Sequence, residues 1–223
     1  MLFFNANNRY VNFGNIPLPT GTAFSISLWL IKDGATNAQD ERVFSKESSG
    51  FDQQFAVNTT NQGGTNTGIQ VRLQTTVGGT LSQNSDIRFG FNQLVHVCVT
   101  YDGSNVRLYI NNQLSNTWAK TGNIVNSNNI LCIGNRALDQ ARQYRGRVFD
   151  ARLYDVTLGP EQVEEIFITR GEDNIHDGLF FRAPLDGYPQ GTAATGANTV
   201  REITNGRHGT PLNSPVYEDK RYN

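Results

Sequence analysis

Acidic side chains come first among the residues that could do chemistry, because hydrolysis of a glycosidic bond uses a pair of carboxyl groups. In retaining enzymes the two groups lie about 5 Å apart, and on a sheet this requires two or three acids alternating along one strand. Glu161, Glu164 and Glu165 instead fall in a segment with helical spacing. Asp150 and Asp155 are five positions apart, on opposite faces of a strand. We therefore predict that the chain is not a glycosidase.

Histidine and cysteine residues offer no nucleophile or metal site. The histidines are His96, His176 and His208, and no Cys or His pair has the spacing of a metal site. A histidine inside a strand, such as His96, is more often a structural residue than a base. Cys98 and Cys132 are the only cysteines, and each lies in an apolar, strand-like run. We predict two buried free thiols, which suits production in a reducing cytoplasm.

Composition and charge exclude further classes of protein. The 223 residues carry a net charge of −1 without a basic stripe, so we expect no nucleic-acid partner. No apolar run approaches the length of a membrane span, so we expect no membrane insertion. The opening residues MLFFNANNRY lack the basic and long apolar regions of a signal peptide. Either this is a mature chain or the protein is made and used without secretion.

The elements that must position any site are β-strands, and residues 96–113, HVCVTYDGSNVRLYINNQ, give the clearest evidence for them. Apolar and polar residues alternate on both sides of Asp102-Gly103, and this pattern predicts a β-hairpin with a tight turn. Abundant Gly, Asn, Ser and Thr fit many short strands joined by such turns. Further strands are predicted over residues 24–31, 43–46, 55–58, 68–73, 130–135 and 148–154.

One short helix is predicted late in the chain. Pro160 occupies a typical first helical position, and Gly171 is a typical residue beyond a helix end. Val163, Ile166 and Phe167 have the spacing of one apolar helix face, which can pack on a sheet. Many strands with one late helix predict a two-sheet sandwich.

The sequences of two of these segments resemble motifs of laminin-G-like, concanavalin A-like jelly-roll domains. Residues 96–113 resemble the family motif WHHVAVTYDGTNVRLYVNG. Residues 144–167, YRGRVFDARLYDVTLGPEQVEEIF, resemble FNGYIDEVRIYNRALSAEEIQALY. The resemblance covers residues 1–170 and implies an all-β fold, an antiparallel jelly-roll sandwich of two sheets with one short late helix. It points to a surface-recognition or structural module rather than an enzyme.

Two features of relatives within this fold are altered here. Pentraxins pair the hairpin cysteine with one on an early strand, and the matching residue here is Ser27, so that bridge is absent. Pentraxins also bind calcium through acidic and amide ligands after the strand that matches residues 130–135. Here Asn135 matches an amide ligand, but Arg136 follows it and Asp139 is the only acid nearby. The resemblance thus implies an incomplete calcium site, and we predict no cofactor.

The tail, residues 171–223, departs from the family order. Its phrase NGRHGTPLNSPVYEDKRYN resembles GNGNHGTLTGSPTYV, which in many laminin-G-like proteins precedes the N-terminal strand. In one interpretation the order is permuted, and the tail adds a strand that brings Val216 beside Phe3. In the other the tail leaves the domain and docks on a neighbouring molecule. We expect the first, because chain termini often lie close together and permutation is tolerated.

A jelly roll with this tail and without a signal peptide resembles uncharacterised laminin-G-like virion proteins of tailed bacteriophages. The resemblance implies a non-enzymatic protein of the virion surface, made in the host cytoplasm. It would decorate the capsid or form part of a fibre or adhesin. Its partners would be other virion proteins or copies of itself in an oligomeric assembly, with host-surface glycans as additional ligands.

The alternative function is that of a free carbohydrate-binding, lectin-like protein. Glycan contact needs an exposed aromatic platform with polar groups around it, and Trp118 is the best candidate. A rim site near Trp118, Asn135 and Tyr144 would then bind the sugar. The competing interpretation of Trp118 is packing against the tail or a neighbouring subunit.

Overall fold

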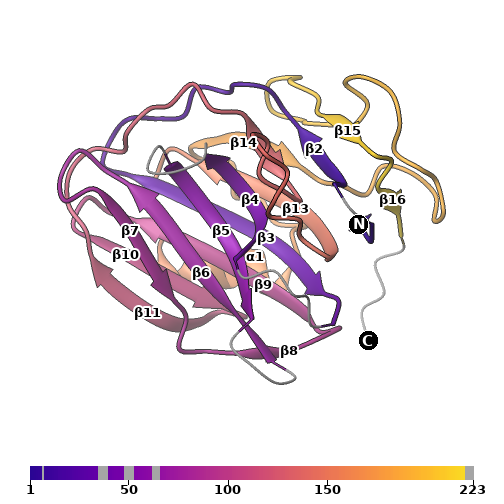
Figure 1. Ribbon diagram of the computed structural model, residues 1–223. Helices are drawn as coiled ribbons and strands as arrows, with labels where there is room; N and C mark the ends of the chain where they lie inside the picture. The colour runs from indigo at the N-terminus through magenta and orange to yellow at the C-terminus, as the bar shows by residue number, and fades with distance from the viewer. Residues whose placement is uncertain (7, 35–39, 48–52, 62–65, 219–223) are drawn as a thin grey trace.

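Two antiparallel sheets, A and B, pack face to face, as Figure 1 shows. The computed structural model describes residues 1–6, 8–34, 40–47, 53–61 and 66–218. Within these ranges each sheet has eight strands, and one short helix lies outside the pair. The predicted fold class, an all-β concanavalin A-like sandwich with a late helix, is confirmed.

Sheet A contains the predicted hairpin. Val106 pairs with Tyr101 across it, and in the turn the Asp102 carboxylate accepts hydrogen bonds from the backbone N–H groups of Ser104 and Asn105 at 2.9 and 2.7 Å. The turn residues predicted from the sequence therefore close the hairpin.

The strands of sheet A, in spatial order, are β11 (Gln113–Ala119), β10 (Asn105–Ile110), β9 (Leu94–Tyr101), β3 (Phe24–Lys32), β13 (Gly146–Tyr154), β1 (Leu2–Phe4) and β16 (Val216–Tyr217), with β14 (Leu179–Ala183) also paired to β13.

Sheet B lies toward the viewer in Figure 1. Its strands, in spatial order, are β15 (Thr210–Leu212), β2 (Tyr10–Asn12), β12 (Leu131–Ile133), β4 (Glu41–Glu47), β5 (Gln53–Asn61), β6 (Asn66–Gln74) and β7 (Thr80–Asn84), with β8 (Phe89–Gly90) also paired to β6. β7 is an edge of sheet B, as β11 is of sheet A. An edge strand has one side without a strand partner, where other groups can approach it.

Aromatic side chains fill the space between the sheets. Phe44 of β4 and Phe55 of β5 meet edge to face, with ring centroids 5.4 Å apart. Phe24 of sheet A lies 5.7 Å from Phe55 across the interior. All three rings are almost completely buried. Such ring pairs contribute beyond the area that they bury, so they help to fix the two sheets against each other.

Helix α1 (Pro160–Ile168) begins where the sequence predicts and packs on the outer face of sheet A. Val163 and Ile166 are completely buried there. Phe167 stacks on Trp29 of β3, with ring centroids 5.8 Å apart. The described part of the chain contains no helix with the length and apolar character needed to cross a membrane.

A buried ion cluster links β13, the segment after α1 and β14. Arg152 contacts Asp150 at 2.6 Å and Asp173 at 2.8 Å, and donates to the Gly171 carbonyl at 2.7 Å. Arg182 reaches the other oxygen of Asp150 at 2.7 Å. Arg152 and Asp173 are completely shielded from solvent. Because the charges satisfy one another, the cluster can hold these segments together within the interior.

The tail contributes strands to both sheets. β16 pairs with β1, where Val216 lies opposite Phe3. β15 pairs with β2, where Pro211 lies opposite Val11. Figure 1 shows these C-terminal strands in yellow beside the N-terminal strands in indigo. Pro211 lacks a backbone N–H, and its place on an edge strand avoids the loss of a ladder hydrogen bond.

Candidate functional site

Trp118 faces the interior rather than solvent. It lies opposite Val106 across the β10–β11 ladder, and cross-strand partners point to the same face of a sheet. Val106 is completely buried, whereas Trp118 is partly exposed and packs against the core. The indole therefore closes the edge of the sandwich and does not form the exposed platform that a sugar ring needs.

Asn135 and Tyr144 are completely buried. The Asn135 side chain accepts hydrogen bonds from the backbone N–H groups of Arg136 and Arg142, at 2.8 and 3.1 Å. The Tyr144 hydroxyl donates to the Ile31 carbonyl at 2.8 Å, and burial raises its pKa well above the ordinary value. Both polar groups therefore hydrogen-bond to the backbone of the protein itself.

The predicted rim site of Trp118, Asn135 and Tyr144 is therefore not assembled on one surface. Trp118 lies on an edge strand of sheet A, whereas Asn135 follows β12 inside sheet B. The physical reason is that both polar side chains hydrogen-bond within the protein. The Asn135 amide bonds to the backbone of the loop after β12, and the Tyr144 hydroxyl donates to the Ile31 carbonyl of β3. A ligand in solvent cannot reach two of the three side chains.

The acid beside this loop is paired with a cation. Arg136 donates to Asp139 through Nε at 2.8 Å and also through Nη2, and this lowers the pKa of Asp139 to about 2. In the ranges that the structure describes, no group of three or more His, Cys, Asp or Glu side chains lies close enough to hold a metal ion. The side chains near Asn135 thus bind one another in this structure.

The two cysteines and His96 are interior residues. Cys98 and Cys132 are buried and unpaired, as predicted, and burial raises the pKa of Cys98 to about 12. His96 is bonded through Nε2 to the Ser27 hydroxyl at 2.9 Å, and its ring lies 4.9 Å from that of Trp29. Burial and the nearby Arg152 lower the pKa of His96 to about 3. A neutral, enclosed imidazole has a structural role, which confirms the interpretation of this histidine.

His96 should make stability depend on pH in a defined window. Its pKa is lowered from 6.5 to about 3 on folding, so between these values the unfolded chain binds the additional proton. The contribution of the neutral His96 imidazole to the free energy of unfolding is complete above pH 6.5 and is lost as the pH falls toward 3. We expect the free energy of unfolding to fall by up to about 1.4 kcal/mol per pH unit in this window.

Urea denaturation of wild type and of His96→Gln from pH 7 to pH 4 measures this effect. In His96→Gln, the free energy of unfolding should depend much less on pH over this range than in wild type. The exposed His176, whose side chain makes no hydrogen bond with the described residues, provides the control, and His176→Gln should behave as wild type does. Equal slopes for wild type and His96→Gln would contradict a buried neutral imidazole.

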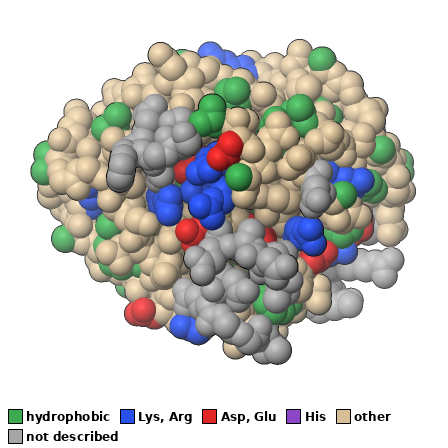
Figure 2. Space-filling view, viewed as in Figure 1, with side chains coloured by type: hydrophobic (Ala, Val, Ile, Leu, Met, Phe, Trp, Pro, Cys, Tyr) green, Lys and Arg blue, Asp and Glu red, His purple; other side chains and the backbone are tan. Residues whose placement is uncertain are grey.

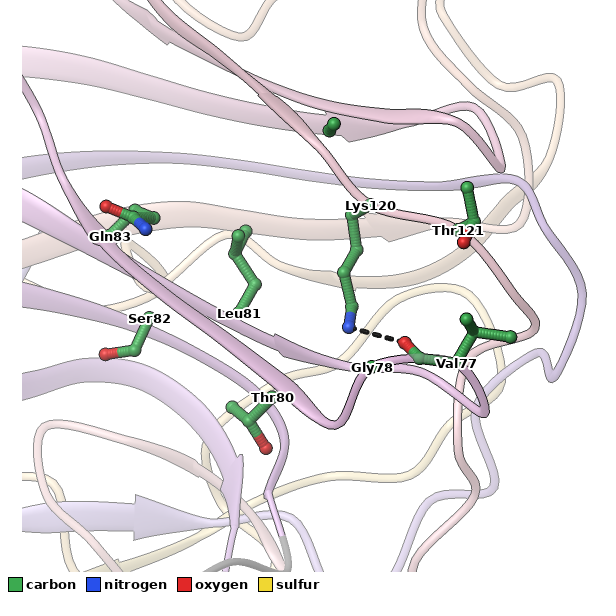
Figure 3. Close-up of a pocket in the computed structure, with 9 residues that line it drawn as sticks. Val77, Gly78, Thr80, Leu81, Ser82, Gln83, Lys120 and Thr121 are labelled. Carbon is green, nitrogen blue, oxygen red and sulfur yellow. Dashed lines mark hydrogen bonds between the residues drawn. The ribbon is translucent and has the colours of Figure 1, made fainter.

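A groove of about 460 Å³ opens at one edge of the sandwich, between β7 and the end of β11. We call it the edge groove, and Figure 3 shows it. Its volume is in the range typical of small-molecule sites. It is lined by Val77, Gly78, Thr80, Leu81, Ser82, Gln83, Ala119, Lys120 and Thr121.

The strand ladder explains which side chains enter the edge groove. Leu81 and Gln83 lie opposite Leu73 and Val71 of β6, and both partners are buried in the core. Leu81 and Gln83 therefore point between the sheets, and because β7 is an edge strand they meet the groove. In Figure 3, Leu81 and Gln83 lie on the side of β7 that faces Lys120, whereas Thr80 and Ser82 point to the other face of β7.

The far wall of the groove is fixed to the β6–β7 turn. The Thr75 hydroxyl donates to the Thr121 carbonyl at 2.7 Å, and the Thr76 N–H donates to the Asn123 carbonyl at 2.8 Å. Gly122 has φ +94°, and a Cβ there would lie 2.9 Å from the Val77 backbone nitrogen. Glycine is thus required for this close approach. The groove is preformed, which reduces the ordering needed on binding.

The lining offers neutral hydrogen-bonding groups beside an apolar surface. Within the described part of the chain, the side chains of Gln83 and Thr121 make no hydrogen bond. None of the lining residues is acidic. Hydroxyl and amide groups can both donate and accept, so they match the hydroxyl groups of a sugar. The groove can bind a polar ligand but lacks a carboxyl pair for hydrolysis.

The carboxylates considered as catalytic candidates do not converge on a common site. Asp150 is almost buried and bound to two arginines. Asp155, Glu161 and Glu164 are exposed, and the latter two lie on helix α1 on the outer face of sheet A. Their arrangement gives no support for general acid catalysis.

A row of polar side chains crosses the outer face of sheet B. Asn58 donates to Gln70 at 2.9 Å, and Gln70 donates to Asn84 at 3.2 Å. Asn58 is buried, whereas Asn84 on β7 is exposed, so the row reaches solvent on the strand that lines the groove. Figure 2 shows Lys and Arg side chains gathered with acidic ones near the middle of this face. The members in register are Arg42, Asn58, Gln70 and Asn84.

Solved structures of several kinds of protein have the same fold. A putative carbohydrate binding protein from Bacteroides ovatus is 16% identical with a TM-score of 0.68, and the match covers 99% of this chain and 61% of that one. The native heptameric SAP-like pentraxin from Limulus polyphemus is 16% identical with a TM-score of 0.61, covering 80% of this chain and 88% of that one. Domain 4 of the arabinanase AbnA from Geobacillus stearothermophilus, solved with arabinotriose, is 19% identical with a TM-score of 0.50, covering 73% and 74%. At identities this low, the structural similarity shows a shared fold.

Sequence comparison assigns the family. No curated protein matches the chain significantly. The profile of the concanavalin A-like lectin/glucanases superfamily matches residues 5–164, which include the predicted hairpin and the strand–helix unit after it. The chain belongs to the concanavalin A-like lectin/glucanases superfamily.

Proposed function

We propose that the protein is a non-catalytic recognition module that binds carbohydrate in the edge groove. The observation that carries this proposal is the groove lining, with unbonded hydroxyl and amide groups beside Leu81 and without an acidic residue. The Bacteroides ovatus protein, described as a putative carbohydrate binding protein, and the arabinotriose-bound AbnA domain support the choice of ligand class.

Binding would combine polar and apolar contacts. Gln83 and Thr121 stand on opposite walls and can exchange hydrogen bonds with sugar hydroxyls. Leu81 offers an apolar surface for the C–H groups of the ring. Without a carboxyl pair at the groove, the saccharide would leave unchanged, as for a lectin.

Replacing Gln83 with alanine should weaken saccharide binding about tenfold, because losing one or two hydrogen bonds removes roughly 1.4 kcal/mol. A glycan array would first identify a bound oligosaccharide, and isothermal titration calorimetry would then compare the variants. The matched control is Gln113→Ala, since Gln113 is also an exposed edge-strand glutamine but does not line the groove. Equal losses in both variants would place the binding site elsewhere.

We further propose that this module acts on the surface of a tailed-bacteriophage virion, by adhesion to virion proteins or copies of itself. The observation that favours this role is the tail phrase at 205–223, whose residues supply β15 and β16 beside the N-terminal strands. Cryo-electron microscopy should find more than about 1,000 Å² buried against other virion chains. Immunogold labelling absent from purified virions would exclude this role and leave a free lectin.

A further inference from the structure

We infer that the edge groove selects saccharides that carry an anionic group, a carboxylate or a sulfate, and that the Lys120 ammonium recognises this group. The inference rests on the proposed function, since it names the ligand class of the same groove. It starts from the placement of one positive charge at the end of the groove (Figure 3).

Lys120 is only 7% exposed, and none of the acidic side chains that the structure describes contacts it. Its Nζ donates to the carbonyls of Val77 and Gly79, both at 2.7 Å. Within the described ranges, no carboxylate lies within ion-pair distance of this nitrogen. Two carbonyl dipoles therefore face a full positive charge. An ammonium has three donors, so one N–H remains for another acceptor.

Another buried lysine shows how a lysine with only a structural role is satisfied in this fold. Lys32 donates to three backbone carbonyls and also has the Glu41 carboxylate at 3.3 Å. All its donors are used and its charge is neutralised. Lys120 has one fewer carbonyl partner and lacks the carboxylate, and it lies nearer the surface than Lys32, at 7% against 3% exposed.

The lack of a counter-charge is unfavourable for the protein alone. Burial lowers the pKa of Lys120, and no charged neighbour raises it again. An anion at the groove would supply the missing charge in a partly desolvated place, where charge-assisted hydrogen bonds are strong. Thr121, the next residue, adds an unbonded hydroxyl to the lining of the same groove.

The anion would occupy one end of the groove. Gly78 lines that end and has φ +70°, and a Cβ there would lie 3.6 Å from Lys120 Nζ. Since glycine has no side chain, the ammonium is less covered from this direction. The neutral part of the saccharide would extend toward Gln83 on β7.

Oligogalacturonates and their methyl esters provide matched probes, since esterification removes the charge and leaves the sugar unchanged. A glycan array should contain these pairs together with sialylated and sulfated glycans beside their neutral counterparts. Wild type should bind the acidic member of at least one pair ten times or more as tightly as the neutral one. The preference should shrink as salt concentration rises.

Lys120→Gln should reduce the affinity for the preferred acidic glycan about tenfold more than the affinity for its neutral partner, so that the preference for the acidic member is lost. Lys120→Arg keeps the charge and should keep the preference. Thermal unfolding of both variants checks that the β6–β7 turn is intact. Equal affinities of wild type for acidic and neutral partners would overturn the inference while leaving the proposed function in place.

Titration with sodium sulfate, followed by ¹⁵N–¹H NMR, tests the anion site without a glycan. Saturable shifts are expected at the Gly78 and Thr121 amides, and Lys120→Gln should abolish them. Linear, unsaturated shifts that persist in Lys120→Gln would overturn the inference. If no array glycan bound but the sulfate shifts saturated, the proposed carbohydrate function would fail while the anion site would stand.

Discussion

Replacing Arg152 with methionine is expected to lower the free energy of unfolding by about 3–5 kcal/mol. The guanidinium contacts Asp150 and Asp173, and without it these carboxylates are left in the interior with their main partner removed. The loss also removes one of the two arginine donors to the Gly171 carbonyl and leaves only Arg182, so the segment after helix α1 should become less ordered. Urea denaturation at pH 7 measures the change in the free energy of unfolding.

The control is the same substitution at Arg107, an arginine that is also paired with an aspartate but lies nearer the surface. Arg107 contacts Asp102 at 2.5 Å, but both side chains are about 30% exposed, at 32% and 27%. Arg107→Met should therefore lower stability by less than about 1 kcal/mol. If Arg152→Met were as mild as this control, the cluster would not act as a buried unit.

Replacing Phe181 with alanine should lower the free energy of unfolding by about 3–5 kcal/mol. Phe181 belongs to β14 in the tail, yet its ring lies 5.0 Å from Phe13 at 90° and 5.8 Å from Phe44 of sheet B. It is 1% exposed, so truncation leaves a cavity in the shared core. Chemical denaturation and the thermal midpoint both report this loss.

This prediction tests how the tail relates to the domain. Ile203, also in the tail, is 46% exposed, and Ile203→Ala should change stability by less than about 0.5 kcal/mol. A small effect of Phe181→Ala as well would mean that residues 171–223 dock at the periphery. A large effect of Phe181→Ala alone would make the tail part of the domain core.

The parts of the fold that follow from local sequence could be predicted. The hairpin depends on alternation around Asp102-Gly103, and helix α1 depends on Pro160 and an apolar face. Both signals lie within about twenty residues of chain, so they need no knowledge of distant contacts. The order of the strands across the sheets has no such local signal, and the family resemblance supplied its outline.

The candidate site could not be predicted in the same way. Trp118 looks exposed in the sequence, but the register of β11 against β10 turns it toward the interior. The edge groove arises because residues 80–83 and 119–121, far apart in the chain, end on the same side of two different sheets. Its lining of Ser, Thr and Gln resembles any surface loop in composition. Lys120 gains significance only from its burial and the absence of an acidic neighbour among the described residues.

The most direct test of carbohydrate recognition at the edge groove is ¹⁵N–¹H NMR mapping with the tightest-binding oligosaccharide from the array. The largest shifts should fall at residues 80–83 and 119–121, and the saccharide should remain intact throughout the titration. Shifts centred on Asn135 and Tyr144, shifts spread evenly over the surface, or cleavage of the saccharide would contradict this account.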